Sequence, residues 1–265
     1  MCSSDLITTH TWSYDEGVAV TTLPGGVPLL VLQRPGAPLV SFGVFQRGGS
    51  CLEVAADEGL ARCTAHLLLK GTTTRTAAQI AEATEELGGG IGVSAGLESL
   101  GWSMSVPTRH LAAATAILAD VLQHPAFPED AIDTERTLTL AELQRQRDDM
   151  GRWPMRLASL AAYQGHPYAR AVLGTPESLA SFDAARLRAF HRAHILQAAS
   201  VITVVGDVQP DDVAQLMTQA FPLLTYHVDP PLSAVAWPAQ SMTTSESRSS
   251  RIACIASSWS GRKLV

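Results

Sequence analysis

One stretch of the sequence reads as a helix around which the rest of the chain can be placed: Gly59-Leu60-Ala61-Arg62-Cys63-Thr64-Ala65-His66-Leu67-Leu68-Leu69-Lys70-Gly71-Thr72. Asp57 and Glu58 precede the apolar run, which suits the positive end of a helix dipole, and the closing Gly-Thr suits a helix stop. Arg62 and His66 are four residues apart, so they share one helix face. Taken alone, such a pair is more often a solvated or locally paired stripe than a functional site.

Strand patterns lie on both sides of this helix. Residues 18–23 and 27–33 are β-favouring runs joined by Pro24-Gly25-Gly26, which predicts a hairpin, and residues 38–47 predict a third strand. Residues 91–95, 100–106 and 200–206 predict three more. Further helices are predicted at residues 76–87, 107–123, 129–149, 151–164, 176–181, 183–195 and 210–221.

The bulk properties exclude several classes of protein. The 265 residues permit one large domain or one domain with loose ends, and 46% hydrophobic with 17% charged residues is ordinary for a globular protein. The net charge of −6 and the scattered basic residues argue against a nucleic-acid partner. No apolar run reaches the roughly 18 residues that span a bilayer, and residues 1–10 lack the order of a signal peptide. The compartment therefore stays open between cytoplasm and periplasm.

The frame Gly-Leu-Ala-x-x-x-x-His-x-Leu-x-Lys-Gly-Thr resembles the key helix of the insulinase/pitrilysin family of zinc metallopeptidases. That family carries the inverted motif His-x-x-Glu-His at this place, in which both His side chains bind zinc and the Glu is the general base for the attacking water. By resemblance, the first His falls on Arg62, the Glu on Ala65 and the second His on His66. The motif is therefore degenerate.

A third zinc ligand of the family is a Glu on a later helix, in a context that resembles Glu135-Arg136-Thr137-Leu138-Thr139-Leu140-Ala141-Glu142-Leu143. The resemblance makes Glu142 the ligand position and Glu135 a supporting carboxylate. The two are seven residues apart and share a helix face. Without the resemblance, two Glu residues on a charged helix read as a solvated surface.

The resemblance extends beyond these helices and predicts the fold. Gly165-His166-Pro167-Tyr168 and Val204-Val205-Gly206-Asp207 are similar to later landmarks of the family. We therefore expect an α+β fold like that of mitochondrial processing peptidase, with one mainly antiparallel sheet and helices largely on one face. The expected divisions are an unstructured leader at 1–16, the peptidase-like unit at 17–221, and a linker and irregular tail at 222–265, for which truncation of the chain is one interpretation.

The chemistry predicted from this motif is limited. Zinc hydrolysis needs three protein ligands, an open position for water and a base. Arg62 cannot be a ligand, because a guanidinium has no lone pair to donate, and Ala65 cannot be a base. The leading interpretation is a non-catalytic subunit that pairs with an active peptidase half and binds no zinc. A competent zinc metalloendopeptidase and a structural core subunit without a peptide role are the alternatives.

The resemblance also implies partners and a binding edge. Family members usually hold two such units facing each other around a chamber, so a second homologous unit is expected as a partner. The family binds extended peptides along one sheet edge, which falls here on Ile91, Gly92, Val93, Ser94 and Ala95. Gly92 stands where the family usually has Asn. If the helices pack as in the family, Arg62 points at Glu142 and Glu135.

Overall fold

The computed structural model describes residues 17–226. Its centre is a single six-stranded sheet, in agreement with the prediction. The strands are β1 (Val18–Thr22), β2 (Pro28–Gln33), β3 (Leu39–Arg47), β4 (Gly92–Ala95), β5 (Ser99–Pro107) and β6 (Ser200–Gly206). Their spatial order is β1-β2-β6-β3-β5-β4. The predicted leader at 1–16 and most of the predicted tail, residues 227–265, lie outside the described residues.

The sheet is mainly antiparallel. β1 and β2 form the predicted hairpin, and β3 pairs antiparallel with both β5 and β6. One pair, β2 with β6, is parallel. β6, the last strand within residues 17–226, lies between β2 and β3, which are neighbours in sequence. Among the described strands, β1 and β4 form the two edges of the sheet.

The helices match the predicted segments closely. They are α1 (Leu60–Leu67), α2 (Ala77–Glu86), α3 (Leu111–Gln123), α4 (Glu129–Asp148), α5 (Arg152–Ala162), α6 (Pro176–Ala180), α7 (Ala184–His194) and α8 (Pro210–Ala220). Thr76 and Gln79 form a reciprocal capping box at the start of α2, and Asp183 caps α7. Most ends agree to within one or two residues, and two differences are larger. The stretch 59–72, predicted as one helix, is α-helical only over Leu60–Leu67 and continues as a 3-10 turn over Leu68–Lys70. Pro107 ends β5 instead of opening a helix, and α3 begins at Leu111 after a single tight turn.

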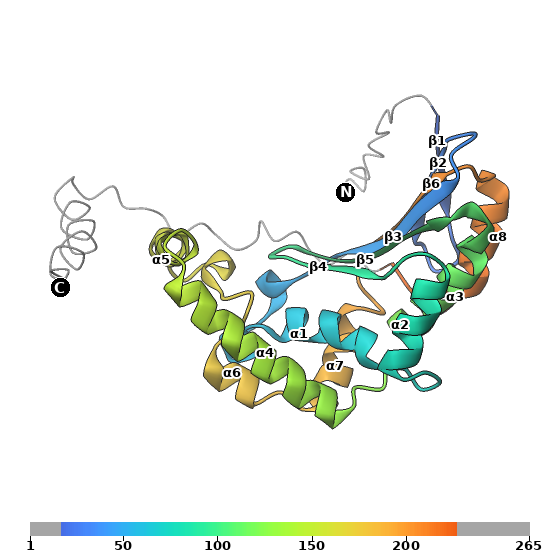
Figure 1. Cartoon of the computed structure of the whole chain (residues 1–265). Coiled ribbons are helices and arrows are strands. Elements are labelled where there is room, and N and C mark those ends of the chain that lie inside the picture. Colours follow the sequence, from blue (N-terminus) through green and yellow to red (C-terminus); the bar gives the residue numbers. More distant parts are fainter. Residues whose placement is uncertain (1–16, 227–265) are drawn as a thin grey trace, which may run out of the picture. The chain divides into compact units, whose positions relative to one another are not determined.

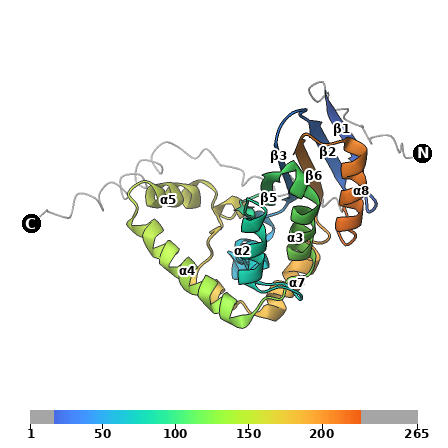
Figure 2. The same cartoon turned by 45° about the vertical axis from the view of Figure 1, so that its right-hand side comes forward.

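The helices that contact the sheet lie on one of its faces, as Figures 1 and 2 show. The alternation along β3 explains why: Val40, Phe42 and Val44 point into the core, whereas Leu39 and Phe45 on the opposite face are exposed. α1 packs beside β4, α3 against β5 and α8 against β2. The α+β fold with helices largely on one face is therefore confirmed.

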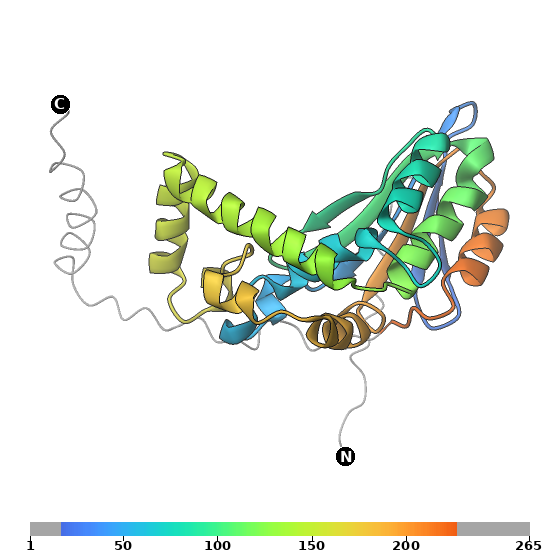
Figure 3. The same cartoon turned by 60° about the horizontal axis from the view of Figure 1, so that its bottom comes forward.

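The first half of helix α4 packs against the body of the domain, and its second half diverges from that body. Ile132, Glu135 and Thr139 are buried, and no residue of α4 beyond Thr139 is. The Arg136 guanidinium donates to the carbonyl oxygens of Leu179 in α6 and of Phe182 just after it, which fixes this half of α4. Figure 3 shows the remainder of α4 running outward to α5, away from the sheet.

Packing continues beyond Phe221, the expected end of the peptidase-like unit. Leu224 is buried in the core, and the backbone N–H of Tyr226 donates to the carbonyl oxygen of Gly25 at 2.8 Å. The N–H of Thr225 likewise donates to the carbonyl oxygen of Leu196. Within residues 17–226, no helix is both long enough and apolar enough to cross a membrane.

Candidate functional site

The start of α1 is fixed by a close backbone approach. Gly59 has a φ of +89°, and a Cβ at this position would lie 2.7 Å from the Cα of Gly174 in the segment before α6. Only glycine fits both conditions without strain. Gly59 therefore lets α1 pack closely against the segment that follows α5.

Glu53 caps α1, and sequence reasoning missed it. Its two carboxyl oxygens accept hydrogen bonds from the backbone N–H groups of Gly59 (3.0 Å) and Ala61 (2.7 Å). Glu53 is 3% exposed, and this burial raises the pKa of its carboxyl from 4.5 to about 7. Asp57 and Glu58, the predicted charges at this helix end, bind elsewhere: Asp57 pairs with Arg186, and Glu58 accepts from the N–H of Ala171.

The middle of α1 is held under the sheet by Trp102. The buried indole of this β5 residue donates from Nε1 to the carbonyl oxygen of Ala65 at 3.1 Å. Val93 of β4 is the register partner of Trp102. Ala65, which stands at the general-base position of the family, is fully buried and carries no acid–base group. The turn of α1 that holds Ala65 and His66 therefore lies next to the β4–β5 pair.

Arg62 joins α1 to α4. Its Nη1 donates to Oε1 of Glu135 at 3.4 Å and to Oγ1 of Thr139 at 3.2 Å. The Arg62 side chain is 20% exposed and that of Glu135 is 7% exposed, so this ion pair is largely removed from water. The expected contact between Arg62 and Glu135 is formed. By resemblance, Arg62 stands at the position of the first zinc ligand of the family.

The expected contact between Arg62 and Glu142 is wrong. Glu142 instead forms an ion pair with Nη2 of Arg145 at 2.6 Å and accepts a hydrogen bond from Nη1 of Arg152 in α5 at 3.2 Å. The physical reason is the course of α4, because Glu142 lies beyond Thr139 on the half of the helix that diverges from the body. Arg145 lies one turn away from Glu142 on the same helix, so its guanidinium reaches Glu142 more readily than that of Arg62 in α1 does.

The remaining groups do not fit a zinc site with three ligands. Burial, and next the positive charge of Arg62, lower the pKa of His66, which favours a neutral imidazole. Among the described residues, however, no three His, Cys, Asp or Glu side chains gather closely enough to hold a metal ion. Cys63 faces the core, and burial raises the pKa of its thiol to about 12.

β4 is an open edge of the sheet. Within residues 17–226 it pairs with β5 alone, which leaves its other side without a strand partner. Gly92 and Ser94 are exposed, whereas Ile91, Val93 and Ala95 are half-buried against the helices below. Figure 1 shows α1 between this edge and α4. The residues predicted to bind an extended peptide therefore lie beside the helix that carries Arg62 and His66.

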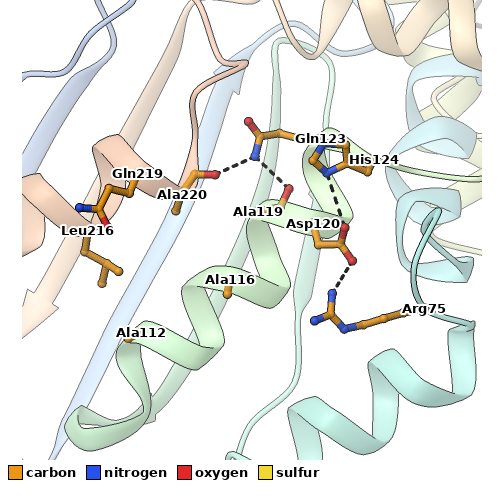
Figure 4. Close-up of a pocket in the computed structure, with 10 residues that line it drawn as sticks. All are labelled: Arg75, Ala112, Ala116, Ala119, Asp120, Gln123, His124, Leu216, Gln219 and Ala220. Atoms are coloured by element: carbon orange, nitrogen blue, oxygen red, sulfur yellow. Dashed lines mark hydrogen bonds and ion pairs between the residues drawn. The ribbon is translucent and has the colours of Figure 1, made fainter.

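A separate hollow of about 370 Å³ lies between α3 and α8, as Figure 4 shows. The titratable groups that line it are Arg75, Asp120 and His124. One carboxylate oxygen of Asp120 accepts from the hydroxyls of Thr72 and Thr74 and from Arg75, and the other lies 3.5 Å from Nδ1 of His124. Asp120 therefore serves to tie residues 72–75 to α3 and is not free for chemistry.

Replacing Arg62 by alanine is expected to lower the free energy of unfolding by about 2 kcal/mol, because Glu135 is left buried without its cation. The long 3.4 Å contact and the partial exposure of Arg62 keep the loss below that of a fully buried pair. Urea unfolding of wild type and variant measures the difference. Arg62→Ala combined with Glu135→Gln is the control and should recover part of the loss. A double variant less stable than Arg62→Ala would contradict the ion-pair account.

Residues 29–176 match the insulinase family, peptidase family M16. An uncharacterised zinc protease of Mycobacterium leprae is 32% identical over 205 residues, which cover 77% of this chain and 46% of that protein. A probable mitochondrial-processing peptidase subunit beta of Arabidopsis thaliana is 28% identical over 229 residues, or 86% of this chain and 43% of that one. The chain spans about half the length of the curated relatives it matches.

Solved structures share the fold. The crystal structure of a peptidase M16 inactive domain from Pseudomonas fluorescens superposes with a TM-score of 0.76 and 24% identity, over 81% of this chain and 53% of that chain. Pitrilysin superposes with a TM-score of 0.71 and 19% identity, over 83% of this chain and 24% of that chain. Because the match to residues 29–176 spans more than half of the 265 residues, the chain belongs to the insulinase family of peptidases, family M16.

Proposed function

We propose that this protein is a non-catalytic half of an insulinase-family peptidase, which pairs with an active half and helps to bind extended peptides. The observation that carries the proposal is the Arg62 guanidinium, bonded to Glu135 and Thr139, at a position that the resemblance equates with a zinc ligand. A permanent cation there repels a second cation and offers no lone pair. Arg62 instead neutralises Glu135, a task that a metal ion would otherwise share.

The absence of a base supports the same proposal. A hydrolytic water needs a group that takes its proton, and Ala65 has none. His66 is the nearest neutral base on α1, but one imidazole cannot be both ligand and base. The competent zinc metalloendopeptidase is therefore the weaker candidate.

The length of the chain supports a partner. The curated relatives are about twice as long as the matched part of this chain, and the match covers 53% of the Pseudomonas domain. By analogy with these longer relatives, we propose that a second homologous unit completes the protein. The partner would supply the zinc ligands and the base, and this chain would supply a sheet edge and one wall of the space between the halves.

We further propose that peptides add to β4 as a seventh strand. An exposed edge strand presents unpaired N–H and C=O groups, which bind an extended backbone with little regard to sequence. The other edge, β1, carries the exposed Val20 and lies at the opposite end of the sheet. It has no functional helix beside it and offers a matched comparison.

We expect a photo-crosslinking amino acid at position 94, in place of Ser94, to capture an extended peptide at least several-fold more efficiently than the same amino acid in place of Val20. Both positions are exposed on edge strands, so the difference isolates the β4 edge. Mass spectrometry of the adducts measures the yields, and the same samples are assayed for peptide cleavage. Equal capture at both edges would contradict the proposed binding edge, and cleavage by the isolated protein would contradict the non-catalytic role.

A further inference from the structure

We propose that the guanidinium at the former metal position is itself a ligand-binding group, which takes a carboxylate of the peptide bound at β4. The carboxylate is an acidic side chain or the C-terminus of the peptide. This inference rests on the proposed function, because it needs a peptide along β4. It replaces a cation site of the family by an anion site.

Two of the three guanidinium nitrogens of Arg62 form no hydrogen bond within residues 17–226. Both of its hydrogen bonds within residues 17–226 come from Nη1, so Nε and Nη2 have no partner among the described residues. The side chain is 20% exposed, and neither nitrogen is among the described buried polar atoms that lack a partner, so an acceptor from outside can reach them. A guanidinium holds a carboxylate best through two parallel bonds. The side chain is thus fixed on one side by Glu135 and Thr139 and open to a second acceptor on the other.

The position of α1 brings this group near the proposed peptide. Trp102, the register partner of Val93, donates to the carbonyl oxygen of Ala65, which places this part of α1 next to β4. Arg62 lies one helical turn before His66 on the same face. α1 also lies between β4 and α4 (Figure 1). A strand added at β4 would therefore pass the helix that carries Arg62.

Two separate ion-pair groups lie along α4. Arg62 pairs with Glu135 at the anchored half, and Glu142 pairs with Arg145 and Arg152 further along the helix, so each group has at least as many guanidiniums as carboxylates. His66 adds no negative charge. Asp149 lies 3.8 Å from Arg152, but one of its oxygens is bound by two backbone N–H groups at the start of α5. Arg145 and Arg152 are largely exposed, which leaves their other N–H groups available to a ligand.

The test compares three fluorescent peptides of one extended sequence: a neutral amidated form, the same form with one internal Glu, and the neutral sequence with a free C-terminal carboxylate. Fluorescence polarisation with the whole protein measures each affinity. We expect at least one acidic form to bind about tenfold more tightly than the neutral form. The form that shows the gain identifies the source of the carboxylate.

Variants assign the preference to Arg62. Arg62→Gln should reduce the ratio of acidic to neutral affinity to about one, and Arg62→Lys should retain part of it, since charge remains but the fork is lost. Arg109→Gln, the same change at an exposed position on the turn before α3, is the control and should leave the ratio unchanged. If Arg62→Gln does not fold, Arg62→Lys and the salt dependence of the wild-type ratio serve in its place.

The outcomes separate this inference from the proposed function. Binding of the neutral peptide without an acidic preference overturns the carboxylate site and leaves the proposed function standing. A preference that survives Arg62→Gln overturns the assignment to Arg62. If no peptide of the set binds, the inference falls together with the proposed peptide-binding role.

Discussion

Replacing Glu53 by alanine is expected to lower the free energy of unfolding by about 4 kcal/mol at pH 6, because two backbone N–H groups at the start of α1 lose their only acceptor. Those groups, on Gly59 and Ala61, are bonded to the two oxygens of one buried carboxyl group. An unsatisfied buried donor costs about 1–3 kcal/mol, and the helix also loses its cap. Urea unfolding followed by circular dichroism measures the difference. A loss below about 1 kcal/mol would show that water replaces the carboxyl.

Glu53→Gln is the matched control, because it keeps the shape and one acceptor oxygen but cannot ionise. Burial raises the pKa of Glu53 from 4.5 to about 7 in the folded protein. Between these values the folded state holds a proton that the unfolded state has released, so the stability that Glu53 contributes falls as the pH rises from about 4.5 to about 7. The glutamine variant should lack this slope. A wild-type stability that rises across the same range, relative to Glu53→Gln, would mean that Glu53 caps α1 as a carboxylate.

Periodicity was sufficient to predict the pieces of the fold. The alternation along residues 38–47 and the capping box at Thr76 and Gln79 are local signals, and both elements form where they were predicted. The order of the strands in the sheet, in contrast, does not follow from local signals. No local pattern predicts that β6 enters between β2 and β3, because that choice depends on contacts across more than 150 residues. Only the resemblance to a known family predicted a single sheet.

The site was predicted in part, and its errors have physical causes. The resemblance located Arg62 near Glu135 correctly, since both lie on the halves of α1 and α4 that pack together. It failed at Glu142, where the divergence of α4 and the competition of Arg145 and Arg152 decide the pairing. A motif position specifies a residue's place on its helix. It does not specify which neighbouring cation forms an ion pair with that residue.

Glu53 was missed because nothing in its own surroundings indicates a cap. It precedes Gly59 by six residues and is separated from α1 by a short irregular turn, so the usual spacing of a capping box does not apply. Asp57 and Glu58 are closer to the helix and were the natural choice. A usable signal would have been the cost of burying a Glu in an otherwise apolar stretch, but burial itself is visible only in the fold.

The wild-type protein is expected to bind zinc weakly or not at all, whereas Arg62→His combined with Ala65→Glu should restore measurable zinc uptake. The new His supplies a lone pair beside His66, and removal of the guanidinium removes the charge that repels the ion. Elemental analysis after dialysis against zinc measures the uptake. Peptidase activity is not expected to return with it, because the opposing half is absent from the isolated chain.

Restored zinc should still be loosely held, and the reason is the pairing of Glu142. Arg145 and Arg152 occupy both of its oxygens, so the third ligand has to be released before it can bind a metal ion. Adding Arg152→Ala to the double variant should therefore tighten zinc by about tenfold or more, the usual scale for groups that orient a metal ligand. Arg109→Ala in the same background removes an equal charge at a distance and should have no such effect.

Ala65 is fully buried, so Glu at this position costs stability until zinc is bound, and the melting temperature of the triple variant should rise with added zinc. Stoichiometric, tightly bound zinc in the wild-type protein would contradict the whole account, because it would require ligands that neither Arg62 nor the Glu142 pairing provides.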